Sequence, residues 1–335
     1  MRLPLRDAAR MSILSSEWRC KWLTIPDLVF DEDHLRKRKS PMDHVRIVDG
    51  TLWNHFGPIY KFSCNLSNIN SKDLSRWIAK LHWNEIKQLI LIPKWGLEVV
   101  PNTLFYCQGL CYLELYCCKL ELHPLLKGFP SLTHLNLRDM YMPEDTLAGL
   151  ISNCPLLERL TLKGHGSYLK VDAPNLRYLD VRGAFRDIWI ESNIPKKLST
   201  TYDHLRYLHI KVDFANLKDI LATLCLWRSS PNLNELKIEC LLPQEEIKYW
   251  DGEEQPDCLL DQLKVVKMVG IFGGLSDLGF VKFILANAPK LETLSFKINE
   301  RVDSRRPSIF EELLRYRRAS PNAQIIYMGT IPFVL

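Results

Sequence analysis

The nine residues PSLTHLNLR at positions 130–138 place a leucine two residues after a proline, and two further leucines three and five residues beyond the first. The same spacing returns at positions 155–163 as PLLERLTLK. A proline at this offset ends a preceding helix, because it forces the residue before it out of the helical region. The alternating leucines that follow are typical of a short strand with one buried face.

This aliphatic spacing recurs along most of the chain, at intervals of 19 to 30 residues. Its copies begin at Ile86, Leu110, Leu132, Leu157, Leu176, Leu205, Leu233, Leu263 and Leu291, with a weaker one at Ile59. The proline stands two residues earlier at Pro130, Pro155, Pro174, Pro231 and Pro289. Motif and period match the leucine-rich repeat, in which each unit supplies one strand and one return segment.

Helical patterns occupy several of the longer intervals, at residues 73–81, 143–153, 217–227 and 275–287. Each unit has an apolar face that it buries only against its neighbours, so the copies are expected to stack into one continuous core. The sequence therefore predicts an α/β leucine-rich-repeat solenoid, a curved parallel sheet with helices on the convex side. An ordinary α/β domain with leucine-rich strands would not repeat the proline offset.

The composition favours a globular intracellular protein, since 47% of the 335 residues are apolar. No CxxC pair or metal-like cluster occurs among the ten cysteines, which lie mostly in apolar runs and indicate buried free thiols in a reducing compartment. Examples are Cys107, Cys111, Cys117, Cys118 and Cys154.

Charge and hydropathy point away from secretion, membranes and nucleic acid. Charged residues interrupt the N-terminus from Arg2 onward, and the longest uncharged run, 99–113, is shorter than the roughly 18 residues of a membrane span. A net charge of +5 is mild for this length, and the basic run at 36–39 is interpreted as a solvated loop. We expect a cytoplasmic or nuclear protein.

Residues 3–30, LPLRDAARMSILSSEWRCKWLTIPDLVF, do not carry the repeat. Leu14, Trp18 and Trp22 stand four residues apart and predict an apolar stripe on one helical face, typical of a cap over the first repeat. The stretch closely resembles the second half of an F-box. The matching positions are Leu3, Pro4, Arg6, Asp7, Ala8, Arg10, Ser12, Leu14, Ser15, Trp18, Arg19 and Trp22.

The C-terminal third resembles the FBD region of plant F-box proteins with leucine-rich repeats. The segments that carry this resemblance lie at 245–273, at 280–294 (FVKFILANAPKLETL) and at 310–327 (FEELLRYRRASPNAQIIY). Physically, the region continues the solenoid and ends it, with an amphipathic last helix through Ile309, Phe310, Leu313 and Leu314 and a closing strand at 323–328.

The resemblance implies a chain in four parts. Residues 1–30 form partial, N-terminally truncated F-box helices, 31–58 a linker and N-terminal cap, 59–240 the leucine-rich repeats, and 241–335 the FBD-like repeats and C-terminal cap. In the F-box family the first module docks on the Skp-type adaptor of a cullin-RING (SCF-type) ubiquitin ligase, and the repeats select the substrate. The adaptor-binding positions are then Leu3, Pro4, Leu5, Ala8, Leu14, Trp18 and Trp22.

Two functions follow from this resemblance. The first is a substrate-recruiting F-box subunit that transfers no ubiquitin itself. The alternative is a truncated leucine-rich-repeat interaction scaffold that no longer docks on the adaptor, because the family's first F-box helix has no counterpart before Met1. A small signalling ligand on the concave face, as in the auxin receptors, has little support in a shorter array without a readable anion pocket.

Substrate-binding residues are expected between and just after the aliphatics of each copy, where side chains point away from the core onto the concave face. A column of cations flanked by tyrosines would favour an acidic or phosphorylated protein substrate, whereas ordinary solubility of an exposed sheet face would also supply polar residues. The candidate binding residues are Tyr112, Tyr116, His134, Arg138, Arg159, Lys163, Tyr178, Arg182, Tyr207 and Lys211, with Glu239 ending the column.

Nothing in the sequence predicts catalysis, a metal or a cofactor. The glycines at 164–166 and 270–274 lack the spacing and the lysine of a phosphate-binding loop and are interpreted as turns. His204 and His209 flank a strand without an evident carboxylate or cysteine partner. We therefore expect a binding protein rather than an enzyme.

Overall fold

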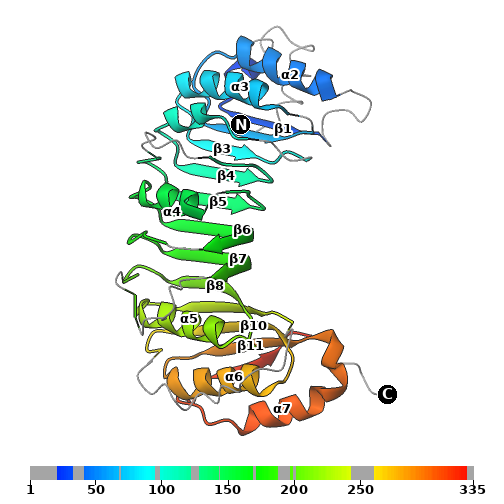
Figure 1. Cartoon of the computed structure of the whole chain (residues 1–335), viewed down its shortest axis with the longest axis vertical. Coiled ribbons are helices and arrows are strands. Elements are labelled where there is room, and N and C mark those ends of the chain that lie inside the picture. The colour runs from blue at the N-terminus through cyan, green and yellow to red at the C-terminus, as the bar shows by residue number, and fades with distance from the viewer. Residues whose placement is uncertain are drawn as a thin grey trace. The chain divides into compact units, whose positions relative to one another are not determined.

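The computed structural model describes residues 21–32, 41–67, 69–94, 99–121, 128–142, 144–168, 171–187, 197–198, 201–242 and 260–329. The chain divides into two compact units, Met1–Ala173 and Pro174–Leu335. Each unit contains six strands that follow one another in sequence order, with every described pairing parallel (Figure 1). This α/β arrangement confirms the predicted leucine-rich-repeat solenoid.

The first unit alternates strands with helices or irregular returns. Its strands are β1 (Asp27–Asp31), β2 (Lys61–Asn65), β3 (Gln88–Leu91), β4 (Tyr112–Tyr116), β5 (His134–Arg138) and β6 (Arg159–Tyr168). Its helices are η1 (Lys21–Thr24), α2 (Pro41–Asn54), α3 (Ser71–Trp83), η2 (Asn102–Tyr106) and α4 (Glu144–Ser152).

The second unit follows the same plan. Its strands are β7 (Tyr178–Asp187), β8 (Tyr207–Val212), β9 (Glu235–Cys240), β10 (Val265–Ile271), β11 (Thr293–Ile298) and β12 (Gln324–Tyr327). Its helices are α5 (Leu217–Arg228), α6 (Leu275–Asn287), η3 (Glu300–Arg305) and α7 (Arg306–Arg315).

The repeated aliphatics form the core because equivalent residues of successive strands pair in register. In the first unit Leu89, Leu113, Leu135 and Leu160 are consecutive partners, and each is at most 1% exposed. In the second unit Leu208 pairs with Leu236 in the same way. The nine predicted copies become β3 to β11, the weaker copy becomes β2, and the predicted closing strand becomes β12.

Strand β1 was not predicted, although the sequence carries its signal. Ile25, Leu28 and Phe30 have the aliphatic spacing of the other copies, and Leu28 and Phe30 are buried. The strand pairs in parallel with β2, placing Phe30 beside Cys64. This additional repeat was not predicted because residues 3–30 were assigned to one helical module.

The four helices predicted in the return segments are all present as α3, α4, α5 and α6. Polar side chains fix their starts: the Asn70 side-chain oxygen accepts the backbone N–H of Asp73 at 2.9 Å, and that of Asn216 accepts the N–H of Lys218 at 3.0 Å. Asp277, in the first turn of α6, accepts the N–H groups of Phe272 and Gly273 at 2.7 and 3.0 Å. The bonds of Asp277 tie helix α6 to the residues that directly follow strand β10.

The two glycine-rich segments differ from the predicted turns. Residues 164–166 continue strand β6, because Gly164 adopts a φ of +120° that allows a close approach to the backbone of Asp139. Gly270 belongs to β10, where a register shift between Val269 and Ile271 marks a bulge. Gly273 and Gly274 form the expected turn into α6, with Gly274 as its N-cap.

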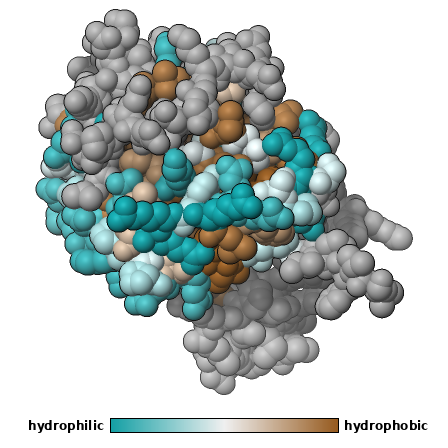
Figure 2. Space-filling view, turned by 90° about the horizontal axis from the view of Figure 1, so that it is seen from below, coloured by the Kyte–Doolittle hydropathy of each residue, from teal (hydrophilic) through white to brown (hydrophobic). Residues whose placement is uncertain are grey.

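Helix α7 shows the predicted amphipathic character with one exception. Ile309 and Leu313 are buried, and the Phe310 ring lies 5.1 Å from that of Tyr327 on β12. Leu314, expected on the apolar stripe, is 66% exposed, because it follows Leu313 by a single residue and points to another side of the helix. Figure 2, which views the end carrying α6 and α7, shows hydrophilic residues interleaved with hydrophobic ones.

Gly128 offers a test of the close packing between return segments. It adopts a φ of +65°, and a β-carbon there would clash with the β-carbon of Asn153. We expect Gly128→Ala to lower the free energy of unfolding by about 1–2 kcal/mol, from left-handed strain and this clash. Gly50→Ala in helix α2, where nothing lies within 4 Å, should instead raise it by about 0.5–1 kcal/mol. Urea denaturation of both variants would measure the difference, and equal effects would contradict it.

Candidate functional site

The side of each sheet that carries the residues alternating with the buried aliphatics is termed the open face. Of the ten predicted binding residues, nine are half-buried there, and Arg159 is exposed. The middle positions of several strands are more enclosed than expected from alternation alone. Glu114 is 9% exposed, Asp180 3% and His209 2%, because long side chains from adjacent positions cover them. A polar layer therefore lies beneath the open face.

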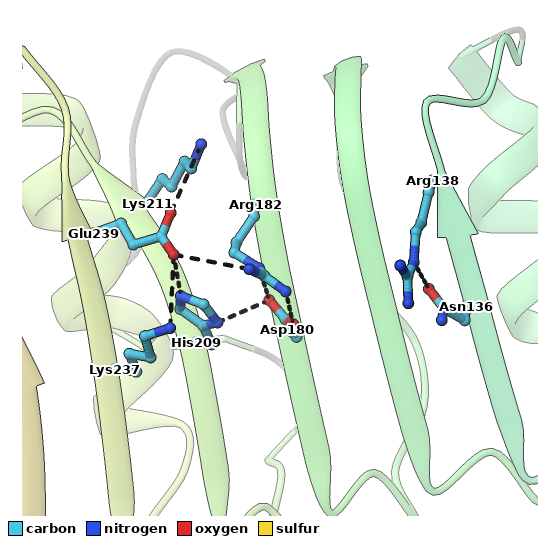
Figure 3. Close-up of polar contacts among 8 residues, drawn as sticks. All are labelled: Asn136, Arg138, Asp180, Arg182, His209, Lys211, Lys237 and Glu239. Atoms are coloured by element: carbon cyan, nitrogen blue, oxygen red, sulfur yellow. Dashed lines mark hydrogen bonds and ion pairs between the residues drawn. The ribbon is translucent and has the colours of Figure 1, made fainter. Parts of the chain in front are cut away.

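In the first unit this layer centres on Glu114 of β4. The hydroxyl of Tyr112 donates to the Glu114 carboxylate at 2.6 Å, and the Arg138 guanidinium lies 3.3 Å from its other oxygen. Arg138 also donates to the side-chain oxygen of Asn136 at 3.1 Å (Figure 3). Burial and the bond to Glu114 raise the pKa of Tyr112 to about 12. Burial and the nearby Arg159 lower the pKa of His134.

In the second unit two tyrosines of adjacent strands stack face to face. The rings of Tyr178 on β7 and Tyr207 on β8 are stacked, with centroids 4.4 Å apart and an interplanar angle of 1°. The two residues are direct partners in the strand register. Burial, followed by the proximity of Tyr178, raises the pKa of Tyr207, so the Tyr207 hydroxyl stays protonated at neutral pH.

Next to this pair lies a charged network across β7, β8 and β9 (Figure 3). Arg182 donates to both oxygens of Asp180, each at 2.8 Å. The His209 ring lies between two carboxylates, with Nδ1 3.1 Å from Asp180 and Nε2 3.0 Å from Glu239. Burial alone would raise the pKa of Asp180, but the bonds from His209 and Arg182 outweigh it and lower that pKa.

The prediction that His209 has no carboxylate partner is therefore wrong, because Asp180 and Glu239 both contact its ring. Asp180 is its direct partner in the β7–β8 register, and Glu239 lies two residues beyond its partner Lys237 on β9. The two carboxylates are 29 and 30 residues away in sequence, so proximity along the chain did not reveal them. Aligning the copies would have placed Asp180 beside His209.

Cations of the predicted column lie close to carboxylates on the same face. Arg138 pairs with Glu114, whereas Arg182 and Lys211 both lie within 4 Å of Glu239. Lys237, which was not among the predicted binding residues, is 3.7 Å from Glu239 as well. Glu239 therefore does not simply end the column of cations. Its carboxylate contacts Arg182, Lys211 and Lys237 of the second unit.

Several other predicted features lie outside the described residues. These are the side chains of the seven adaptor-binding residues, the helix expected around Leu14 and Trp18, and the basic run at 36–39. Trp22 falls within η1, but its side chain is not among those described. Within the described ranges no helix is long and apolar enough to cross a membrane.

The described cysteines are all free, yet they differ in burial. Cys107, Cys118 and Cys154 are buried as expected, whereas Cys111 and Cys117 are only half-buried, since they flank strand β4 rather than pointing into its core. Burial raises the pKa of Cys107 and Cys118 to about 12, so these thiols stay protonated. In the part of the chain that the structure describes, no group of three or more potential ligands is placed to hold a metal ion.

Comparison with known proteins agrees with this architecture. A family model described as FBD-associated F-box protein At5g56370, LRR repeats, matches residues 74–184, and the FBD model matches residues 253–296. The Arabidopsis thaliana F-box/FBD/LRR-repeat protein At1g13570 is 33% identical, over 98% of this chain and 94% of the relative. The FBD-associated F-box protein At5g44490 from the same plant is 24% identical, over 97% and 87% respectively.

The stacked parallel strands and their open face define a leucine-rich-repeat protein. Since the similarity to At1g13570 extends over nearly the whole of both chains, this chain belongs to the plant F-box/FBD/LRR-repeat family.

Proposed function

We propose that this chain is a substrate-recruiting F-box subunit of a cullin-RING (SCF-type) ubiquitin ligase. The observation that carries the proposal is the similarity to an F-box/FBD/LRR-repeat protein along 98% of the chain, together with an open face rich in half-buried aromatic and charged residues. Aromatic residues and arginine are enriched where proteins bind other proteins. In this function the chain positions a target and transfers no ubiquitin.

The proposal divides the work between two surfaces. Residues 1–30 would dock on a Skp-type adaptor through the apolar stripe that includes Leu14, Trp18 and Trp22. The repeats at 59–240 would bind the target through the open face, and residues 241–335 would complete and close the array. The buried free thiols favour the reducing environment of the cytoplasm or the nucleus as the site of action.

Adaptor docking is tested by calorimetric titration of the purified chain against a Skp-type adaptor. We expect submicromolar binding, weakened at least about thirtyfold in a Trp18→Ala, Trp22→Ala double variant, because the loss of even one aromatic anchor at an interface often costs about 2 kcal/mol. Trp83→Ala is the matched control, since Trp83 is 81% exposed and lies outside the F-box-like stretch.

The outcome separates the two functions that the family allows. Loss of binding in the double variant, with the control unchanged and circular dichroism intact, would support the ligase subunit. If the folded chain does not bind the adaptor at all, the adaptor-docking part is rejected, and the alternative of a leucine-rich-repeat interaction scaffold takes its place.

A further inference from the structure

The carboxylate of Glu239 lies at the centre of four cationic or potentially cationic groups (Figure 3). Its Oε1 atom is 3.0 Å from His209 Nε2, 3.7 Å from Lys237 Nζ and 3.8 Å from Arg182 Nη1. Its Oε2 atom is 3.7 Å from Lys211 Nζ. The Arg182 and Lys distances exceed those of good charge-assisted hydrogen bonds, which are about 2.7–2.9 Å. The Glu239 carboxylate thus forms a hydrogen bond with His209 but only loose contacts with Arg182, Lys211 and Lys237.

The balance of charge in this network is positive. Three of its side chains are ordinary cations at neutral pH, namely Arg182, Lys211 and Lys237, whereas Asp180 and Glu239 are carboxylates. The His209 ring bridges the two carboxylates. On the flanking positions of the open face, Glu235 of β9 and Lys267 of β10 offset each other. One positive charge is therefore in excess, and the excess becomes two when an incoming group displaces the Glu239 carboxylate.

The members of the network are accessible from solvent. The side chains of Arg182, Lys211 and Lys237 are 27%, 33% and 25% exposed, and that of Glu239 is 26% exposed. Asp180 and His209, at 4% and 2%, form the buried floor. An incoming anion would therefore meet the three long cations first, while the floor holds Arg182 in place through its two bonds to Asp180.

We propose that Glu239 occupies the place of a partner's anion, and that this site on β7, β8 and β9 binds a phosphorylated side chain of a target protein. The inference rests on the proposed function, because it names the class of target bound at the open face. A phosphate group carries about −1.5 to −2 charges at pH 7 and offers three acceptor oxygens, which matches the surplus better than one carboxylate does. The stacked Tyr178 and Tyr207 provide an adjacent aromatic surface for a neighbouring residue of the target.

This assignment makes opposite predictions for two kinds of substitution. Removing the internal carboxylate in Glu239→Gln frees the cations for the incoming phosphate and should tighten its binding by about tenfold, the effect of one charge-assisted hydrogen bond. Removing cations in a Lys211→Gln, Lys237→Gln double variant should abolish the preference for phosphate. Lys264→Gln is the matched control, since Lys264 pairs with Glu292 at 2.9 Å on the exposed surface of the same unit.

The experiment measures fluorescence anisotropy of labelled degenerate nonapeptides with a central phosphoserine, serine or glutamate against the full chain. We expect the phosphoserine peptides to bind at least about tenfold more tightly than the serine peptides, with glutamate peptides in between. The preference should increase in Glu239→Gln, vanish in the double lysine variant and persist in Lys264→Gln.

Equal binding of phosphoserine and serine peptides by the wild-type chain would overturn the proposal. So would unchanged or weaker phosphoserine binding in a folded Glu239→Gln chain, since Glu239 would then serve only to hold the strands together. Binding of the Skp-type adaptor is measured separately, so a chain that docks on the adaptor but ignores phosphate rejects this site and leaves the ligase-subunit proposal in place.

Discussion

Replacing Phe280 by alanine is expected to lower the free energy of unfolding by about 3–5 kcal/mol, the usual cost of removing a fully buried aromatic side chain. Phe280 of α6 has no exposed surface, and its ring lies 5.0 Å from that of Phe214 and 5.1 Å from that of Trp227. Phe214 follows strand β8, and Trp227 belongs to α5. The side chain therefore joins two successive return segments, and its loss leaves a cavity between them.

The matched control for Phe280 is Leu275→Ala, in the first turn of the same helix. Leu275 is 67% exposed, so its truncation should change the free energy of unfolding by less than about 0.5 kcal/mol. Urea denaturation followed by circular dichroism measures both variants. A loss below about 1 kcal/mol for Phe280→Ala would contradict the prediction, because it would show that neighbouring side chains fill the space left by the ring.

Replacing Asp180 by asparagine is expected to remove about 3 kcal/mol of stability at neutral pH, because Arg182 and the buried His209 lose their shared carboxylate. The effect should depend on pH. The pKa of Asp180 is lowered in the folded chain, since hydrogen bonds from His209 and Arg182 outweigh the opposing effect of burial. A lowered pKa means that the carboxylate stabilises the fold above the unfolded value of about 3.9, and that this contribution is lost as the pH falls through the folded value.

The stability difference between the wild-type chain and Asp180→Asn should consequently shrink as the pH falls below about 4. Thermal unfolding across a pH series measures it, with Asp261→Asn as a control because Asp261 is exposed. A difference that stays constant down to acid pH would mean that Asp180 acts through shape and not through its charge.

The repeat spacing alone predicted most of the fold. Leucines at fixed offsets identify strands because burial on one face requires them, and the return helices follow from their own periodicity. Strand β1 was not predicted, because Leu28 and Phe30 lie at the end of the stretch that was assigned to the helical module. The continuation of β6 through Gly164 was not predicted either, because glycine is compatible both with a turn and with a strand residue of positive φ.

The candidate site was less predictable from sequence. The open-face positions of Arg182 and Lys211 follow directly from alternation along their strands. The network around Glu239 does not, because it joins residues of three repeats through side-chain conformations that no spacing encodes. Residues such as Asp180 and His209 look exposed by alternation, yet they are enclosed by the longer side chains around them.

The in-register stacking of the strands also sets a length scale for recognition. Neighbouring parallel strands lie about 4.8 Å apart, whereas an extended peptide advances about 3.3 Å per residue. Crossing from β7 to β9 is therefore a distance of about 10 Å, the length of three extended residues. Successive side chains of an extended segment point to opposite sides, so a segment lying across these strands would direct one side chain to the network while its two immediate neighbours point away, and recognition at this position would span about three residues.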